Sequence, residues 1–110
     1  MNFDVSLSDG AAADILAILK WIDDRSRPGA STWLRKWDEV LQSIRARADH
    51  FGPAPESYEY REAIRQVVFK TRRGRPYRAL FVIREMHVYV LHVRGPGQNV
   101  LSSDEIRLPD

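Results

Sequence analysis

The feature that most constrains the fold is a change in the spacing of apolar residues near the middle of the chain. Up to residue 50 they recur every three or four positions, which is the period of an amphipathic helix. After residue 62 they form short β-branched and aromatic runs, which are typical of strands. A chain that changes period in this way is expected to pack its helices on one face of a sheet.

The first half predicts one short strand and two helices. Apolar and polar residues alternate over residues 3–7, which predicts a strand. Helical spacing then covers residues 9–25 and 29–50, and the short connection predicts an antiparallel helical hairpin. The expected boundary residues are Ser8 or Asp9 as the first N-cap, Pro28 in the first turn of the second helix, and Gly52-Pro53 at its end.

The second half predicts a loop over residues 52–61 and then three strands, at residues 63–70, 77–84 and 87–94. Their short links predict an antiparallel meander. The element order is therefore β-α-α-β-β-β, an α+β fold with the helical hairpin on one face of a mostly antiparallel sheet. We expect a single domain over residues 1–110, with its core at about 3–96 and a C-terminal tail at 97–110.

The formal net charge of +2 conceals an uneven distribution of charge. Residues 1–60 hold seven Lys and Arg against ten Asp and Glu, whereas residues 61–110 hold ten against five. Six cations and no anion lie between Lys70 and Arg84, and five of these six are arginines. This pattern indicates a nucleic-acid or acidic protein partner for the second half.

Several classes of protein are excluded by what the sequence lacks. There is no cysteine, so disulfides, thiolate nucleophiles and cysteine-bound metals are excluded. The three histidines are scattered without ligand spacing, and we expect no metal site. The N-terminus has no signal-peptide pattern and the apolar runs are too short to cross a bilayer, so we expect a cytoplasmic protein that does not enter the membrane.

A set of short stretches carries a resemblance to a known family through its order and spacing. The stretches are Leu7-Ser8-Asp9, Pro55-Glu56, Ile64-Arg65-Gln66-Val67, Tyr77-Arg78-Ala79-Leu80-Phe81 and Val88-Tyr89-Val90-Leu91-His92-Val93. Together they resemble the RelE/ParE superfamily of toxins from bacterial type II toxin–antitoxin pairs, over about residues 3–96. The stretch Leu91–Ile106, which ends in Ser103-Asp104-Glu105-Ile106, is also similar to the HigB branch, although Gly95-Pro96-Gly97 replaces the Lys-Lys pair usual in that branch.

The resemblance implies a small toxin that a cognate antitoxin protein neutralises, without a small-molecule cofactor. ParE-type members inhibit DNA gyrase by binding it, whereas RelE-type members cleave messenger RNA on the ribosome. A third hypothesis is a decayed toxin that acts only as a protein-binding module. The antitoxin is expected to add a helix or a strand to the meander face and to cover its basic patch.

Three residues are candidates for a metal-independent endoribonuclease site. Glu56 is the candidate base for the 2′-hydroxyl, Arg78 the phosphate clamp, and His92 the acid for the leaving oxygen. In the nuclease branches that this chain resembles, the acid or stacking group usually follows the last strand. Here Gly95-Pro96-Gly97 occupies that place and has no titratable side chain, which favours the gyrase-binding interpretation over the nuclease.

Strand alternation gives a second reason to favour a binding role. If Ile83 pairs with Val88 and the pairing continues without a break, Ala79 faces His92 and Tyr77 faces Arg94. His92 and Arg78 then lie on opposite faces of the sheet. A one-residue bulge would remove this objection. The candidate target- or antitoxin-binding residues form a larger basic set, which comprises Lys70, Arg72, Arg73, Arg75, Arg78 and Arg94.

Each candidate also has a structural alternative. A hydrogen-bonded, partly buried histidine is the favoured interpretation of His92, and a turn residue that of His87. Glu56 lies in a loop where most carboxylates are solvated, and the basic set could be a solvated hairpin tip. The expected roles of the remaining residues are Trp33 and Trp37 as core anchors and His50 as a cation at a helix C-terminus.

Overall fold

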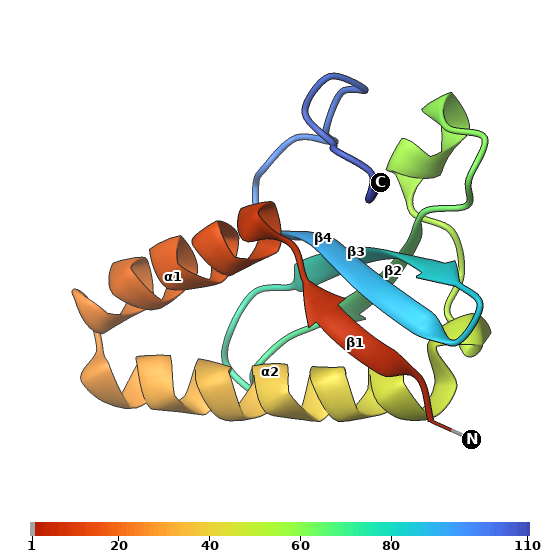
Figure 1. Cartoon of the computed structure of the whole chain (residues 1–110). Coiled ribbons are helices and arrows are strands. Elements are labelled where there is room, and N and C mark those ends of the chain that lie inside the picture. The colour runs from red at the N-terminus through yellow and green to blue at the C-terminus, as the bar shows by residue number, and fades with distance from the viewer. Residues whose placement is uncertain (1) are drawn as a thin grey trace.

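The structure is a computed structural model that describes residues 2–110, and its element order is the predicted β-α-α-β-β-β. Figure 1 shows helix α2 on one side of the sheet, with the C-terminal segment and the 3₁₀ helix at Pro55–Glu59 on the other side. The elements are β1 (Asp4–Leu7), α1 (Asp9–Asp23), α2 (Arg27–Arg47), the 3₁₀ helices η1 (Ala48–His50) and η2 (Pro55–Glu59), β2 (Arg65–Phe69), β3 (Tyr77–Arg84) and β4 (His87–Arg94).

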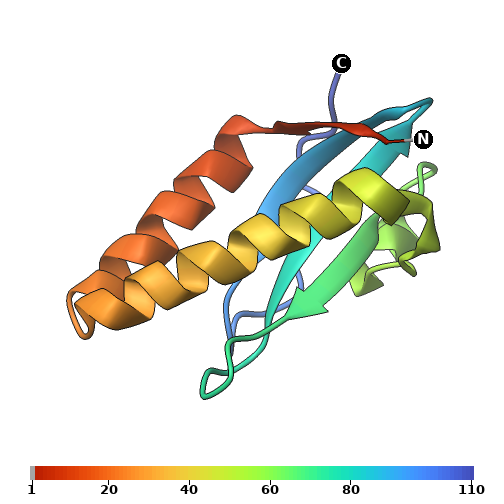
Figure 2. The ribbon, with the colours of Figure 1, turned by 90° about the horizontal axis from the view of Figure 1, so that it is seen from below.

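The sheet has the strand order β1-β4-β3-β2. Strands β2, β3 and β4 form the predicted antiparallel meander, and β1 pairs in parallel with β4. The parallel pairing places β1 at the far edge of the sheet, with β2 at the opposite edge. Viewed from below in Figure 2, α2 crosses the sheet and α1 lies beside it, so the hairpin covers one face.

Both helices begin where the capping residues place them. The Ser8 hydroxyl accepts from the Ala11 N–H at 3.0 Å, and the Ser26 hydroxyl accepts from the Gly29 N–H at the same distance. Pro28 lies in the first turn of α2, as predicted. Helix α1 ends two residues earlier than expected, and the last turn assigned to the second helix is the separate 3₁₀ helix η1.

Buried apolar side chains form one cluster on each face of the sheet. The helix-facing cluster contains Trp33 and Trp37, confirmed as core anchors, whose stacked rings lie 6.2 Å apart. The second cluster lies on the opposite face, which we call the tail face because the C-terminal tail (residues 97–110) covers it. This cluster brings the tail residues Leu101 and Ile106 together with Leu80, Val82, Leu91, Ile64 and Ala54.

A bulge in β4 corrects the predicted register. Ile83 pairs with Val88 as expected, and the pairing continues to Phe81 and Val90. Leu91 is then an extra residue, so that Leu80 pairs with His92 and Arg78 with Arg94. The prediction that His92 and Arg78 lie on opposite faces is therefore wrong, because directly paired residues of antiparallel strands share a face.

No helix within residues 2–110 has the length and apolarity needed to cross a membrane.

Candidate functional site

The tail face holds a buried ion pair between two of the predicted catalytic residues. The guanidinium of Arg78 donates from Nη1 to Glu56 Oε1 at 2.8 Å and from Nη2 to Glu56 Oε2 at 2.6 Å. The Glu56 side chain is fully buried, whereas that of Arg78 keeps 19% of its surface exposed. The expectation of a solvated Glu56 is wrong, because η2 turns this carboxylate inward beneath the tail.

Two neighbours complete the hydrogen bonding of this pair. The backbone N–H of Leu101 donates to Glu56 Oε2 at 3.0 Å, and Arg78 Nη1 also donates to the Gln66 side-chain oxygen at 3.1 Å. A buried charge pair is tolerated when its remaining donors and acceptors are satisfied in this way. One hydrogen-bond network around the ion pair therefore links η2, β2, β3 and the tail.

The environment of Glu56 suits a structural carboxylate better than a general base. Burial alone would raise the pKa of Glu56, but the bidentate Arg78 guanidinium and the Leu101 N–H outweigh it. The net result is a pKa below the ordinary value of 4.5. Because a base needs a pKa near the working pH, this carboxylate is poorly placed to abstract a proton while the pair is closed.

His92 is engaged by a different partner. Its Nδ1 lies 2.8 Å from Asp14 Oδ2, and the same oxygen accepts the Val93 N–H at 2.9 Å. The histidine is partly buried and hydrogen-bonded, which confirms the structural interpretation. The bulge thus brings His92 to the same face as Arg78, yet no hydrogen bond in residues 2–110 joins it to Glu56 or Arg78.

The predicted basic set divides into two groups. Lys70, Arg72, Arg73 and Arg75 are exposed on the connection between β2 and β3, which we call the basic loop (residues 70–76). Arg78 and Arg94 instead lie under the tail. Arg94 donates from Nη2 to the Asn99 carbonyl at 2.8 Å, and its buried Nε has no hydrogen-bond partner within residues 2–110.

The tail is held by contacts that the sequence did not predict. The Tyr60 hydroxyl donates to the Ser103 carbonyl at 2.6 Å, and Arg84 donates to the Asp110 backbone oxygen at 3.1 Å. Arg84 also forms a bidentate pair with Glu62, at 2.9 and 3.0 Å. The one available signal was the presence of four aliphatic residues in the tail, which are Val100, Leu101, Ile106 and Leu108.

His87 was predicted to be a turn residue, but it lies in a strand and contacts two neighbouring side chains. It begins β4, its Nε2 lies 2.7 Å from the Ser6 hydroxyl, and its ring stacks on Tyr89 at 4.3 Å. The turn itself is Glu85-Met86, where Glu85 takes the left-handed conformation with φ of 57°. His50 ends η1, and its Nε2 lies 3.9 Å from the Asp49 carboxylate.

The arrangement defines a RelE/ParE-like fold, as the sequence predicted. Among solved structures, the fold is similar to a chain described as "Chromosomal ParDE TA system from P. aeruginosa", with a TM-score of 0.64. The two chains are 19% identical, and the similarity covers 84% of this chain and 94% of the other. No protein-family model and no curated protein matches the sequence.

Proposed function

We propose that this protein is the toxin of a toxin–antitoxin pair, and that it arrests growth in the cytoplasm by binding a target such as DNA gyrase. The shared fold supports the toxin role, because the similar solved chain comes from a ParDE TA system. No metal or small-molecule cofactor has a part in this proposal.

The observation that carries the binding mechanism is the closed Glu56–Arg78 pair. A metal-free ribonuclease needs a free base and a free cation at the same phosphate. Here the two charges neutralise each other under Leu101, and His92 is bound to Asp14. Opening the pair would break the hydrogen bonds between two buried charges, which costs on the order of several kcal/mol.

The basic loop is the part of the site that remains open to a protein partner. Its cations are exposed and close together in sequence, and within residues 2–110 no ion pair joins Arg72, Arg73 or Arg75 to a carboxylate. Arginine favours planar, bidentate contacts with carboxylates. We assign this loop to the acidic side chains of the antitoxin, which would cover it in the neutral complex.

A ribosome-dependent ribonuclease is the second candidate, and one observation favours it. The Leu91 bulge places His92 and Arg78 on the same face of the sheet, where lifting the tail would expose both. Cleavage would then depend on the tail leaving the sheet. The binding mechanism has no such requirement, which is why we prefer it.

Controlled expression tests the proposal. The chain is induced from a tight promoter with and without the neighbouring open reading frame, and growth is followed. We expect arrest that the neighbour relieves, and purified protein should block supercoiling by purified gyrase. Arrest with normal supercoiling and new messenger RNA ends would favour the ribonuclease, and no arrest would refute the toxin role.

Charge reversal in the basic loop tests how the toxin is neutralised. The triple change R72E/R73E/R75E should leave the fold intact, because all three side chains are exposed. We expect the neighbouring gene product to lose its protection against this variant. The matched control is R107E, which reverses an exposed arginine on the tail and should be neutralised normally.

A further inference from the structure

Helix α1 presents a largely apolar surface to solvent. Over residues 10–19 its one charged side chain is Asp14, and that carboxylate is hydrogen-bonded to the sheet. Leu16 is 69% exposed, and the neighbouring Ala13 and Ala17 are exposed as well. A helix that is apolar on all sides is ordinarily covered on all sides, so the outer face of α1 is suited to a contact.

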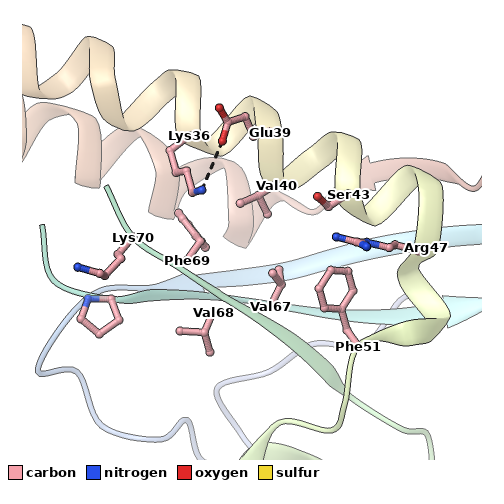
Figure 3. Close-up of a pocket in the computed structure, with 11 residues that line it drawn as sticks. Lys36, Glu39, Val40, Ser43, Arg47, Phe51, Val67, Val68, Phe69 and Lys70 are labelled. Carbon is pink, nitrogen blue, oxygen red and sulfur yellow. Dashed lines mark hydrogen bonds and ion pairs between the residues drawn. The ribbon is translucent and has the colours of Figure 1, made fainter. Parts of the chain in front are cut away.

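Helix α2 shows the more usual polar surface. From Arg35 onward, charged side chains recur on its solvent side, as at Asp38 and Arg45. The groove that α2 forms with β2, drawn in Figure 3, also has charged side chains around it, such as Lys36 and Lys70. In Figure 2, α2 lies between α1 and β2, so the outer face of α1 is a separate surface from this groove.

Four exposed residues form a straight line along the outer face of α1, which we call the α1 seam. They follow one another at spacings of four, three and four positions, and they are Asp9, Ala13, Leu16 and Lys20. Residues at this spacing share one side of a helix and form the contact line of packed helix pairs. Within residues 2–110, neither Asp9 nor Lys20 has an ion-pair partner.

The α1 seam is complementary to its own reverse. An anion stands at one end and a cation at the other, and each is four residues from the nearer apolar side chain. When two copies of α1 lie antiparallel about a two-fold axis, Asp9 of each copy meets Lys20 of the other. The small Ala13 then faces the larger Leu16, which leaves room for both. A parallel arrangement would instead bring like charges together.

We propose that this protein forms a two-fold dimer through the α1 seam, with an Asp9–Lys20 ion pair at each end of the contact. The overlapping helices span residues 9–20, which is about 18 Å at 1.5 Å per residue. Because a single helix pair is a small interface, we expect a Kd of about 10–100 µM. The dimer uses neither the basic loop nor the Glu56–Arg78 pair, so it is independent of the toxin role.

Sedimentation equilibrium of the full-length protein tests for this dimer. The concentration is varied from about 5 to 500 µM, and the mass should rise from that of the monomer toward that of the dimer. L16E places two carboxylates at the apolar centre of the contact and should raise Kd about tenfold or more. The matched control is M86E, at a 41% exposed apolar residue in the turn before β4, and its Kd should stay within about twofold.

Charge exchange tests the antiparallel register. D9K and K20E each place like charges at both ends of the contact, so each protein alone should have a Kd raised about tenfold or more. When the two variants are mixed in equal amounts, both ends of the mixed dimer again hold opposite charges. The mixture should therefore recover a Kd within about threefold of the unchanged protein. Both side chains are exposed, so the folds should remain intact.

Three results would overturn the inference. One is a monomeric mass for the unchanged protein at every concentration, a second is equal weakening by L16E and M86E, and the third is no association when D9K and K20E are mixed. A monomeric chain whose α1 amides are protected from exchange only after the neighbouring gene product is added would assign this face to that protein instead.

Discussion

The substitution E56Q tests whether the Glu56–Arg78 pair is structural. It removes the negative charge while retaining nearly the same shape, and the amide oxygen can still accept from the Leu101 N–H. Leu101 and Arg78 Nη2 both donate to Oε2, so an amide oxygen at that position keeps the 2.6 Å hydrogen bond. The amide NH₂ at the Oε1 position cannot accept from Nη1, so Arg78 loses its 2.8 Å hydrogen bond and its opposite charge. The matched control is E59Q, which removes an exposed carboxylate from the same 3₁₀ helix.

The expected loss of stability follows from the burial of the two partners. Breaking a buried ion pair by removing one member costs about 3–5 kcal/mol. Glu56 is fully buried, but Arg78 keeps 19% of its side-chain surface in solvent, which recovers part of that cost. We therefore expect E56Q to lower the free energy of unfolding by about 2–4 kcal/mol. At roughly 4 °C per kcal/mol, Tm falls by about 8–16 °C.

Urea unfolding at several pH values is the assay. The pKa of Glu56 is below 4.5 in the folded state, so the unfolded state binds more protons as the pH falls. The stabilisation by this carboxylate is thus complete above its ordinary pKa and is lost as pH falls through the folded value. We expect a constant gap between the unchanged protein and E56Q near neutral pH, which narrows below about pH 4.5.

Two results would contradict the structural role of the pair. The first is an E56Q protein whose free energy of unfolding at neutral pH lies within about 0.5 kcal/mol of the unchanged protein, as expected for E59Q. The second is a gap that stays constant into strong acid, because protonated Glu56 should resemble the glutamine.

Three further substitutions test the packing around the site, each by urea unfolding. Leu101 is 6% exposed, and L101D should lower the free energy of unfolding by about 2–4 kcal/mol because it buries a charge. Val100 is 54% exposed, and V100D should lower it by less than about 0.5 kcal/mol. S8A removes the N-cap of α1 and the 2.9 Å hydrogen bond to the Leu91 carbonyl, and should cost about 1–2 kcal/mol; an unchanged midpoint would count against the cap. W37A removes a ring from the helix-facing cluster and should cost about 3–5 kcal/mol, and a smaller loss would show that the hairpin is anchored elsewhere.

Local pattern was sufficient to predict the elements that depend on neighbours in the chain. The bounds of β3 and β4 were predicted correctly, because β-branched and aromatic residues fill both strands and a tight turn separates them. Ser8, one of the two residues proposed as the first N-cap, does cap α1, since capping is a local interaction. Helix α2 begins at Arg27, two residues before the predicted start, because Ser26 caps it. The final turn of the second helix was assigned wrongly because its apolar spacing continues to Ala48.

Contacts between distant residues could not be predicted in the same way. Leu91 lies in an unbroken apolar run without a glycine, so nothing local marks the bulge that reverses the facing of His92. The burial of Glu56 depends on Arg78, 22 residues away, and on Leu101, 45 residues away. The resemblance supplied the identities of Glu56 and Arg78, but only the fold shows that they bind each other.

Our central proposal is that the protein arrests growth by binding rather than by cleaving RNA, and messenger RNA 5′ ends test it most directly. They are mapped across the transcriptome shortly after induction of the unchanged chain, at the time when growth stops. We predict the same set of ends as in uninduced cells. New ends within coding regions that appear with the arrest, and that R78A abolishes, would contradict the account.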